Sequence, residues 1–575
     1  MTELRIFDLS SNHFNGSIDL SPLPSLKSLE YLDLSYNYFN PITLSSFFNL
    51  SKLEAIFSDG NKLVDETLSQ RWNLGFQLKV FSCSSCLSTK SSQRITRFLH
   101  YQFDLQVINI PHYNFSGQFP TLLLENNTRL VFLSLQNNSV SYITALQYLY
   151  LDNNHFSGEI SHSISNLTNL FAIDFSNNNL LGMLPRWMGN MTLLSGIALG
   201  KSRLEGPIPV ELGNLKSLSF LDLSHNSLVG SIPSCFNWTN MKHVHLNKNR
   251  LTGPITSAFK SCSDLVTLNL RDNYFTGNIP DWIGNLSSLS ILLLKANYLQ
   301  GKIPFQICLL EKLRLLDLSN NNCFGQIPHC LSNITFEPTN AKSYIPNNVI
   351  FGIYYNLIFD ILSRIFHSRV NMYFESDESS LMVVLQEVEF TTKNRILSYK
   401  GDILNYRSGI DLSCNKLKGE IPAELGDLSN IHALNLSFKN LTGSIPTQFS
   451  NPQQIESLDL SHNNLDDTIS PQLIELNSLA VFNVAHNKFW GTTPKRKAQF
   501  GTFDESSYKE NPLLCGPPLH KACTKIQTSS NIPIDDERDE ACGFMDLEVF
   551  YASFAVSYTI MLLGIVSILY INLHW

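Results

Sequence analysis

The sequence predicts an α/β solenoid, a horseshoe or superhelix with short parallel strands on its concave face and 3-10 or irregular segments on its convex side. Two observations predict this fold. A phrase of 24 residues recurs in register between 172 and 328, and each copy alternates apolar and polar residues as a strand does. One copy cannot bury its own leucines, so the copies must stack. A third observation, the apolar run 549–573, adds one C-terminal transmembrane helix.

The repeated phrase is best preserved in four copies. They read LDLSHNSLVGSIP at 221–233, LNLRDNYFTGNIP at 268–280, LLLKANYLQGKIP at 292–304 and LDLSNNNCFGQIP at 316–328. Leu-x-Leu-x-x-Asn-x-Leu at this period is the leucine-rich-repeat signature. Its leucines point inward, and its Asn amide can satisfy backbone groups of neighbouring coils. Gly-x-Ile-Pro then opens an extended convex segment, because proline cannot donate a hydrogen bond.

Composition narrows the class of protein. A solenoid grows in one dimension, so 575 residues do not require several cores. A net charge of −8 argues against nucleic-acid binding, and eleven cysteines are too few for a disulfide scaffold. Twelve Asn-x-Ser/Thr sequons indicate an extracellular chain, although an Asn-rich and Ser-rich repeat also makes sequons by chance. The candidate glycosylation sites are Asn114, Asn126, Asn166, Asn190, Asn237, Asn285, Asn333 and Asn440.

The first segment, 1–330, is the main solenoid. It begins within a repeat, with no signal peptide and no N-terminal cap, so we expect that the sequence is truncated there. The Asn position recurs mostly every 23 to 25 residues, but only 16 residues separate Asn138 from Asn154. The solenoid is therefore expected to be irregular near 139–146, with poor packing between the flanking coils.

The period disappears between 331 and 406 and returns for four repeats at 407–494. Because the register survives, we interpret 331–406 as an island inserted between two coils. A long insertion of this kind is typical of a functional loop. An unstructured linker is the alternative.

The C-terminal part contains a cap, a polar stretch and the apolar run. The cap covers 495–525, where Cys515 and Cys523 are placed to form a disulfide. An acidic juxtamembrane segment follows at 526–548. Residues 549–573 carry no charge, and as a helix these 25 residues would be about 37 Å long at ~1.5 Å per residue. This length exceeds the ~30 Å of a bilayer core. A buried core helix is the alternative interpretation.

The concave face carries the candidate ligand site. Its outward residues form a cationic column with an apolar patch beside it: Lys201, His225, His243, His245, Lys248, Arg271, Ile291, Leu293 and Lys295. Such a column suits a carboxylate or an acidic peptide. The competing interpretation is a solvated face, because Ser-His-Asn also fills this phrase at His462.

Neither catalysis nor metal binding is predicted. The sequence has no phosphate loop, no metal pair of histidines and no nucleophile elbow, so we expect no enzymatic activity and no cofactor. Cys83-x-x-Cys86 lacks a second pair for zinc, which favours buried structural thiols. Cys235 with Cys262, and Cys308 with Cys330, are candidate pairs on the convex side.

The order of these segments, with the cap phrase NPLLCGPPL, resembles the plant leucine-rich-repeat receptor-like proteins, the class that includes the tomato Cf-type resistance receptors. The resemblance implies a kinase-less, single-pass receptor of the plasma membrane with an extracellular N-terminal region. It also implies a peptide or microbial ligand, a leucine-rich-repeat receptor kinase as partner, and a role in defence or development. The signal peptide, the basic cytosolic tail and the family's Gly-xxx-Gly membrane spacing are missing. A leucine-rich-repeat inhibitor without a membrane span and a non-signalling truncated decoy are the alternatives.

Overall fold

The computed structural model describes the chain in ranges separated by gaps. The described residues are 3–18, 21, 23–47, 49–61, 63–64, 75–83, 102–110, 132–134, 146–153, 156–236, 238–336, 387–392, 395–400, 403–404, 406 onwards to 523. They fall almost entirely within one compact unit, Met1–Lys521. The cap is described as far as residue 523, whereas most of the island and the whole run 549–573 lie outside the described residues.

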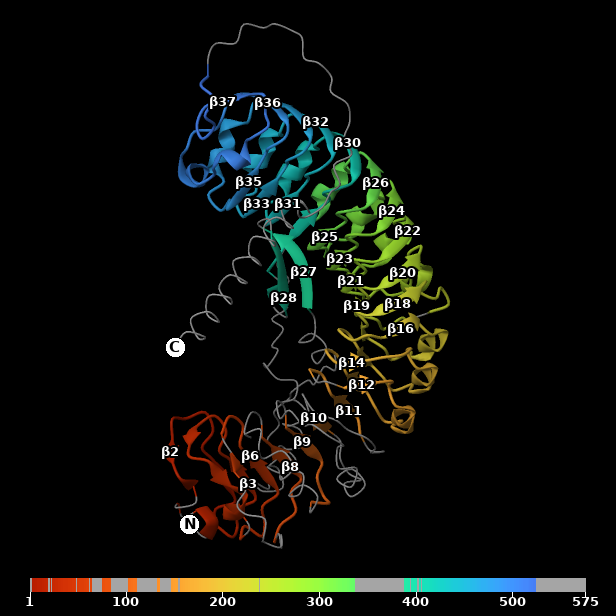
Figure 1. Cartoon of the computed structure of the whole chain (residues 1–575), viewed down its shortest axis with the longest axis vertical. Helices are drawn as coiled ribbons and strands as arrows, with labels where there is room; N and C mark the ends of the chain where they lie inside the picture. The colour runs from red at the N-terminus through yellow and green to blue at the C-terminus, as the bar shows by residue number, and fades with distance from the viewer. Residues whose placement is uncertain are drawn as a thin grey trace, which may run out of the picture. The chain divides into compact units, whose positions relative to one another are not determined.

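One parallel sheet runs through the stack of coils (Figure 1). In the described residues it has 18 strands, one per coil, each paired with the strand of the next coil. The strands are β1 (Ile6–Asp8), β3 (Tyr31–Asp33), β6 (Ala55–Phe57), β8 (Val80–Ser82), β9 (Val107–Asn109), β10 (Phe132–Ser134), β11 (Tyr148–Tyr150), β13 (Ala172–Asp174), β15 (Gly196–Ala198), β17 (Phe220–Asp222), β19 (His243–His245), β21 (Thr267–Asn269), β23 (Ile291–Leu293), β25 (Leu315–Asp317), β29 (Gly409–Asp411), β31 (Ala433–Asn435), β33 (Ser457–Asp459) and β35 (Val481–Asn483). Their outward side chains form a surface that we call the strand face.

Further strands follow where each coil leaves the main sheet. The longer set forms a second parallel sheet from β16 (Glu205–Pro207), β18 (Ser227–Gly230), β20 (Arg250–Gly253), β22 (Tyr274–Asn278), β24 (Tyr298–Gly301), β26 (Asn322–Gly325), β30 (Lys416–Glu420), β32 (Asn440–Gly443), β34 (Asn464–Asp467), β36 (Lys488–Thr492) and β37 (Leu513–Cys515). Short pairs are β2 (Asn15–Gly16) with β4 (Tyr38–Phe39), β5 (Ile42–Thr43) with β7 (Leu63–Val64), and β12 (Ser157–Gly158) with β14 (Asn179–Leu180).

Short 3-10 helices complete most of the coils. They are η2 (Leu23–Ser25), η3 (Leu44–Phe47), η4 (His162–Asn166), η5 (Arg186–Asn190), η6 (Val210–Asn214), η7 (Ser257–Phe259), η8 (Asp281–Asn285), η9 (Phe305–Leu309), η10 (His329–Asn333), η12 (Ala423–Asp427), η13 (Thr447–Ser450), η14 (Pro471–Glu475), η15 (Ala498–Gly501) and η16 (Glu505–Ser507). Several begin directly after the proline of Gly-x-Ile-Pro. This proline is the N-cap residue, and its backbone is extended. The predicted solenoid of parallel strands and 3-10 segments is therefore correct.

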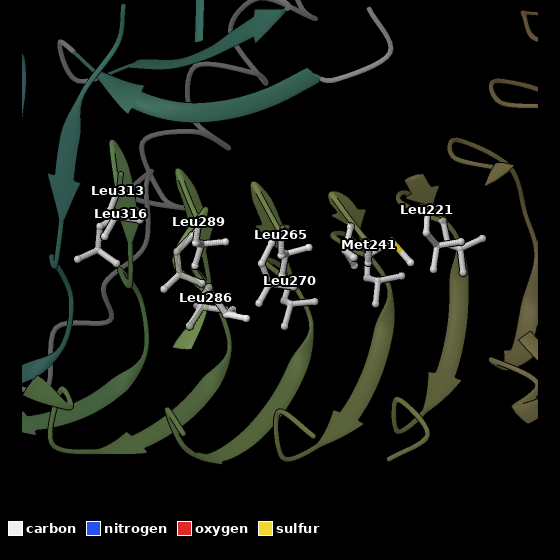
Figure 2. Close-up of a cluster of buried hydrophobic side chains, with 14 of the residues drawn as sticks. Leu221, Met241, Leu265, Leu270, Leu286, Leu289, Leu313 and Leu316 are labelled. Atoms are coloured by element: carbon white, nitrogen blue, oxygen red, sulfur yellow. The ribbon is translucent and has the colours of Figure 1, made fainter. Parts of the chain in front are cut away.

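The core is a column of leucines that continues from coil to coil (Figure 2). Met241, Leu265, Leu289 and Leu313 stand at equivalent positions 24 residues apart, and each is completely buried. Each coil supplies only one layer of this column. The apolar area leaves water only when neighbouring coils cover it, which explains why a single repeat cannot fold alone.

A ladder of asparagine amides joins the coils. The Nδ2 of Asn273 donates to three carbonyls, those of Leu246, Leu270 and Arg271, at 2.9–3.1 Å, and its Oδ1 accepts from the amide of Leu251 at 3.0 Å. The same pattern recurs at Asn226, Asn249, Asn297, Asn321, Asn415, Asn463 and Asn487. It also extends to Asn511, in the cap, which the sequence interpretation missed. The 24-residue step from Asn487 was the available signal.

Lys439 occupies one ladder position and cannot make these bonds. It is 6% exposed, and its ammonium has no hydrogen-bond partner. Burial lowers the pKa of Lys439 to about 7, although Asp411 and Cys323 act in the opposite direction. We expect Lys439→Asn to raise the thermal unfolding midpoint, because an amide there could donate to Leu412, Leu436 and Ser437 as Asn463 does one coil later.

The gain from Lys439→Asn depends on pH. Below about pH 7 the lysine is charged in both the folded and the unfolded chain, so the full free-energy cost of burying the charge destabilises the folded chain. As pH rises toward the ordinary pKa of 10.5, the folded chain holds a neutral amine and this cost falls. The midpoint difference from the wild type should therefore be larger at pH 6 than at pH 9 in calorimetry. The exposed Lys416→Asn is the matched control, and an equal gain at both pH values would contradict the assignment.

The island leaves the sheet unbroken. β25 pairs directly with β29, with Leu315 opposite Gly409, so the coils on either side of 331–406 are neighbours. The strands on either side of the short step near 139–146 also pair, with Phe132 opposite Tyr148. Residues 135–145, including Asn138, lie outside the described residues.

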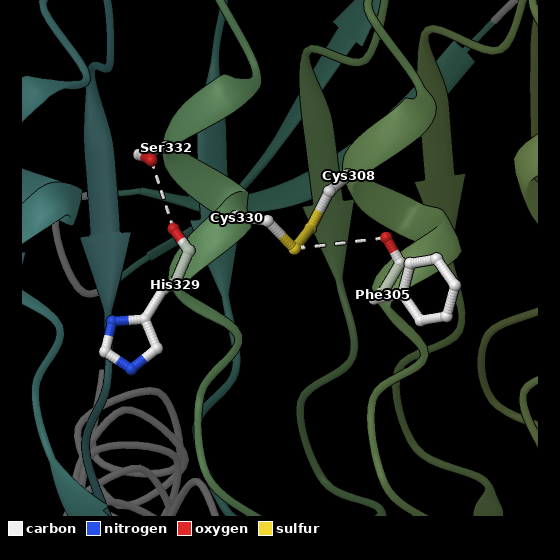
Figure 3. Close-up of a disulfide and its surroundings, with 5 residues drawn as sticks. All are labelled: Phe305, Cys308, His329, Cys330 and Ser332. Atoms are coloured by element: carbon white, nitrogen blue, oxygen red, sulfur yellow. Dashed lines mark hydrogen bonds between the residues drawn. A yellow bond between two sulfur atoms is a disulfide. The ribbon is translucent and has the colours of Figure 1, made fainter.

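The cysteines agree with the predictions only in part. Cys308 in η9 and Cys330 in η10 form a disulfide between adjacent coils, as predicted (Figure 3). Pairing of Cys235 with Cys262 is wrong, since both are free and the buried Cys262 thiol donates to the Trp238 carbonyl. Cys83 is buried but takes part in a disulfide, so a free thiol there is also wrong. Cys515 and Cys523 are each disulfide-bonded, and their pairing with each other remains a prediction.

Candidate functional site on the strand face

The end of the island folds back onto the strand face. Its described residues form an antiparallel hairpin of β27 (Glu387–Thr392) and β28 (Arg395–Lys400), which Figure 1 shows beside β21, β23 and β25. Side chains alternate along β27, so Val388 and Phe390 share one face and the two glutamates share the other. We call this element the island hairpin.

The glutamates of the island hairpin pair with the cationic column of the strand face. Lys201 Nζ lies 3.4 Å from Glu387, and Lys248 Nζ lies 3.1 Å from Glu389. Arg271 donates to the Glu389 carbonyl at 2.7 Å and also binds its carboxylate. Burial alone would raise the pKa of Glu389, but Arg271 and Lys248 outweigh it and hold that pKa below its usual value. The carboxylates are therefore ionised partners of the column at neutral pH.

The apolar face of the hairpin covers the apolar patch of the strand face. Val388 and Phe390 are each 1% exposed and form a separate buried cluster with Ile291, Leu293 and Leu315. Tyr399, Leu404 and Ala433 complete this cluster. The hairpin is thus held both by ion pairs and by a small hydrophobic core.

The structure brings the predicted column together and shows what contacts it. Lys201, Lys248 and Lys295 are partly exposed, and Lys295 donates to Thr391 at 3.1 Å. Five of the nine residues are buried: His243, His245, Arg271, Ile291 and Leu293. Burial lowers the pKa of His243 to about 3 and also lowers that of His245. These histidines are neutral, so the positive charge of the column comes from its lysines and arginine.

The backbone conformation explains why histidine occurs at one position of the cationic column. The residue directly before each ladder position is left-handed, with φ of 56° at Lys201, 54° at His225 and 55° at Lys248. Asn, Asp and His are the non-glycine residues that most readily adopt this conformation. His recurs at 225, 462 and 486 because this turn conformation favours it. This observation supports the interpretation that His225 is a turn residue of a solvated face and not a ligand contact. The two lysines are not explained in this way.

The glycosylation candidates among the described residues lie at exposed positions of the coils. Asn166, Asn190, Asn285 and Asn333 each end a 3-10 helix and are exposed, and Asn440 is exposed at the start of β32. These positions could accept a glycan without disturbing the core, and modification remains a prediction. Asn114, Asn126 and Asn237 lie outside the described residues.

Comparison with known proteins identifies the class. Two family models, both described as leucine rich repeat, match this chain, one at 2–63 and 239–299 and the other at 145–167, 169–191, 217–238, 312–334 and 454–476. The structure is similar to the crystal structure of PEPR1–AtPEP1, with a TM-score of 0.55 and 25% identity over 86% of this chain and 67% of that one. It is similar in fold to the plant peptide hormone receptor RGFR1 in complex with RGF2, with a TM-score of 0.58 and 23% identity over 89% and 79% of the chains. The chain is a leucine-rich-repeat solenoid protein.

Sequence relatives add to this comparison. It is 43% identical to Cuscuta receptor 1 of Solanum lycopersicum over 690 residues, which cover 100% of this chain and 61% of that protein. It is 47% identical to Receptor-like protein 13 of Arabidopsis thaliana over 38% of this chain and 21% of that one. The chain is similar in sequence to these plant receptor proteins, and it spans about three fifths of the length of Cuscuta receptor 1. Within the residues that the structure describes, no helix has the length and apolar character to span a membrane.

Proposed function

We propose that this chain is the ligand-binding part of a plant cell-surface receptor without enzymatic activity. It binds an extracellular peptide or microbial ligand on the strand face and signals through an associated leucine-rich-repeat receptor kinase. Residues 549–573 anchor it in the plasma membrane. One observation carries the proposal: an inserted hairpin is docked on the strand face, beside partly exposed cations.

Two further findings support it. The similarity to Cuscuta receptor 1 extends over the entire chain, including the island. The structure of PEPR1–AtPEP1 has the same fold, and RGFR1, which is similar in fold, is a plant peptide hormone receptor in complex with RGF2. A continuous array of parallel strands offers a long surface to an extended ligand, and the docked hairpin gives that surface a second wall.

Ligand capture tests the proposal. The full chain, purified from leaf membranes in detergent and immobilised, is incubated with apoplastic fluid and with microbial extracts, and retained peptides are identified by mass spectrometry. We expect at least one peptide to be retained tenfold more by the wild type than by the double variant Lys201→Glu/Lys248→Glu. Lys216→Glu/Lys260→Glu is the matched control, because both lysines are exposed away from the strand face.

The kinase partner is tested with the same material. The enriched peptide should increase co-purification of a leucine-rich-repeat receptor kinase from leaf membranes. Equal retention by all three chains, or kinase association that is independent of the peptide, would contradict the proposed function.

A further inference from the structure

A cavity of about 190 Å³ lies between the island hairpin and the strand face. Its floor is formed by outward residues of β13, β15, β17, β19 and β21, and its roof by Glu387, Glu389 and Lys400. One water needs only ~10–15 Å³ of such space, so the cavity has room for a larger group. Because both walls come from distant parts of the sequence, the cavity exists only when the hairpin is docked.

Small residues create the hollow. Ala198 lies between Asp174 and Asp222 in the sheet, where both neighbouring coils have a carboxylate. Gly200 lies two residues further on, where the neighbouring coils have Ser176 and Ser224. A Cβ at Gly200 would lie 2.9 Å from Asp222 Oδ1 and 3.0 Å from Oδ2. Because Ala198 carries only a methyl group and Gly200 has no side chain, this coil leaves space beside the Asp222 carboxylate.

The floor of the cavity presents two carboxyl groups that no cation of the described residues pairs with. On the roof, Glu387 is paired with Lys201 and Lys400, and Glu389 with Lys248 and Arg271. On the floor, the carboxylates of Asp174 and Asp222 accept backbone bonds from Ser176 and Ser224, at 2.9 Å and 2.8 Å. Among the described residues, neither carboxylate has a lysine or arginine partner.

Burial, with the nearby Asp152 and Asp222, raises the pKa of Asp174 to about 8. This is the direction expected for a carboxyl group that lacks a counter-cation, and it leaves Asp174 mostly protonated at neutral pH until a cation lies beside it.

Two buried polar atoms independently point to a missing hydrogen-bond donor. His245 and Asn269 both line the cavity and are only 3% and 2% exposed. His245 Nε2 and Asn269 Oδ1 have no hydrogen-bond partner. An amide oxygen can only accept, and the unprotonated nitrogen of a neutral imidazole accepts, so an N–H group satisfies Asn269 Oδ1 and, when the ring proton is on Nδ1, also His245 Nε2. Buried polar groups are normally paired, so two unpaired polar atoms that line the same cavity are informative.

We propose that this cavity binds the cationic end of an arginine or lysine side chain from an extracellular peptide. The assignment rests on the proposed function and names the chemistry of one ligand contact. A guanidinium or ammonium group would pair with Asp222 and Asp174 and donate toward Asn269 and His245. An anion is disfavoured, because the cations that line the cavity already hold Glu387 and Glu389.

A matched pair of small probes tests the cavity directly. N-acetyl-arginine amide carries the cation, and N-acetyl-citrulline amide has nearly the same shape without the charge. In isothermal titration calorimetry with the full chain, we expect saturable binding of the arginine probe and at least tenfold weaker binding of the citrulline probe. Equal binding of the two probes, or none by the arginine probe at tens of millimolar, would overturn the assignment.

Two variants locate the binding. Asp222→Asn keeps the acceptor for the Ser224 amide but removes the charge, and Ala198→Leu fills the hollow without changing any charge. Each variant should bind the arginine probe at least tenfold more weakly than the wild type does. An unchanged thermal unfolding midpoint would show that the variant is folded. Asp281→Asn, an exposed carboxylate on η8, is the control and should bind as the wild type does.

The outcome can be separated from that of the proposed function. If captured peptides are retained equally by the wild type and by Asp222→Asn, the receptor proposal stands and the cavity assignment falls. If the arginine probe binds but no extracellular peptide is retained, the cavity assignment stands and the receptor proposal falls.

Discussion

Replacing Phe390 by alanine is expected to release the island hairpin from the strand face while the stack of coils remains folded. Phe390 is 1% exposed within the buried cluster of Ile291, Leu293 and Leu315. Truncating a buried phenylalanine typically costs about 3–5 kcal/mol, which is large compared with what a two-stranded hairpin can supply by itself. Hydrogen exchange of the β27 and β28 amides should therefore accelerate by at least a hundredfold.

The control is Ile396→Ala, because Ile396 lies on β28 of the same hairpin and is 47% exposed. Its exchange should match that of the wild type. The amides of β19 and β21 report on the stack beneath and should stay protected in both variants. Unchanged protection of β27 in Phe390→Ala would show that the ion pairs alone hold the hairpin.

Gly409 provides a second test of the same contact. A Cβ at this position would lie 2.6 Å from the Phe390 ring, so Gly409→Ala should also loosen the hairpin. Leucine is smaller than phenylalanine and leaves room for the added Cβ. The double variant Gly409→Ala/Phe390→Leu should therefore lose less amide protection in the hairpin than the sum of the losses in the two single variants. Simple additivity would mean that the two residues do not share the contact.

Removal of one ladder amide should destabilise the stack itself. Asn273→Ala leaves the carbonyls of Leu246, Leu270 and Arg271 and the amide of Leu251 without their side-chain partner. Each buried group left unpaired costs about 1–3 kcal/mol, so we expect a loss of several kcal/mol in the free energy of unfolding by denaturant. Asn240→Ala removes one exposed bond to the Lys216 carbonyl and should have little effect.

Asn273→Asp separates hydrogen bonding from packing. The substitution keeps the size and the Oδ1 acceptor but replaces the donating Nδ2 with an oxygen that faces three carbonyls. It should be at least as harmful as alanine at neutral pH. Stability close to that of the wild type would show that the ladder contributes shape and not hydrogen bonds.

The repeat and its consequences were predictable from the sequence. Leucines at positions such as Leu265 and Leu289, and amides at positions such as Asn297, recur at a fixed step, so their neighbours in space are their equivalents one step away. The cationic residues of the strand face were predictable for the same reason. The period also contained the signal for Asn511, which the interpretation of that segment as a separate cap obscured.

The sequence by itself therefore determined the stacked coils, the outward column and the place of the island, because a periodic chain repeats its local contacts. Only the tertiary structure decided what lies on that column. Glu389 binds Arg271 across 118 residues, and no period links an aperiodic insertion to the repeats that it touches. The docking of the hairpin and the cavity beneath it both follow from that single long-range contact surface.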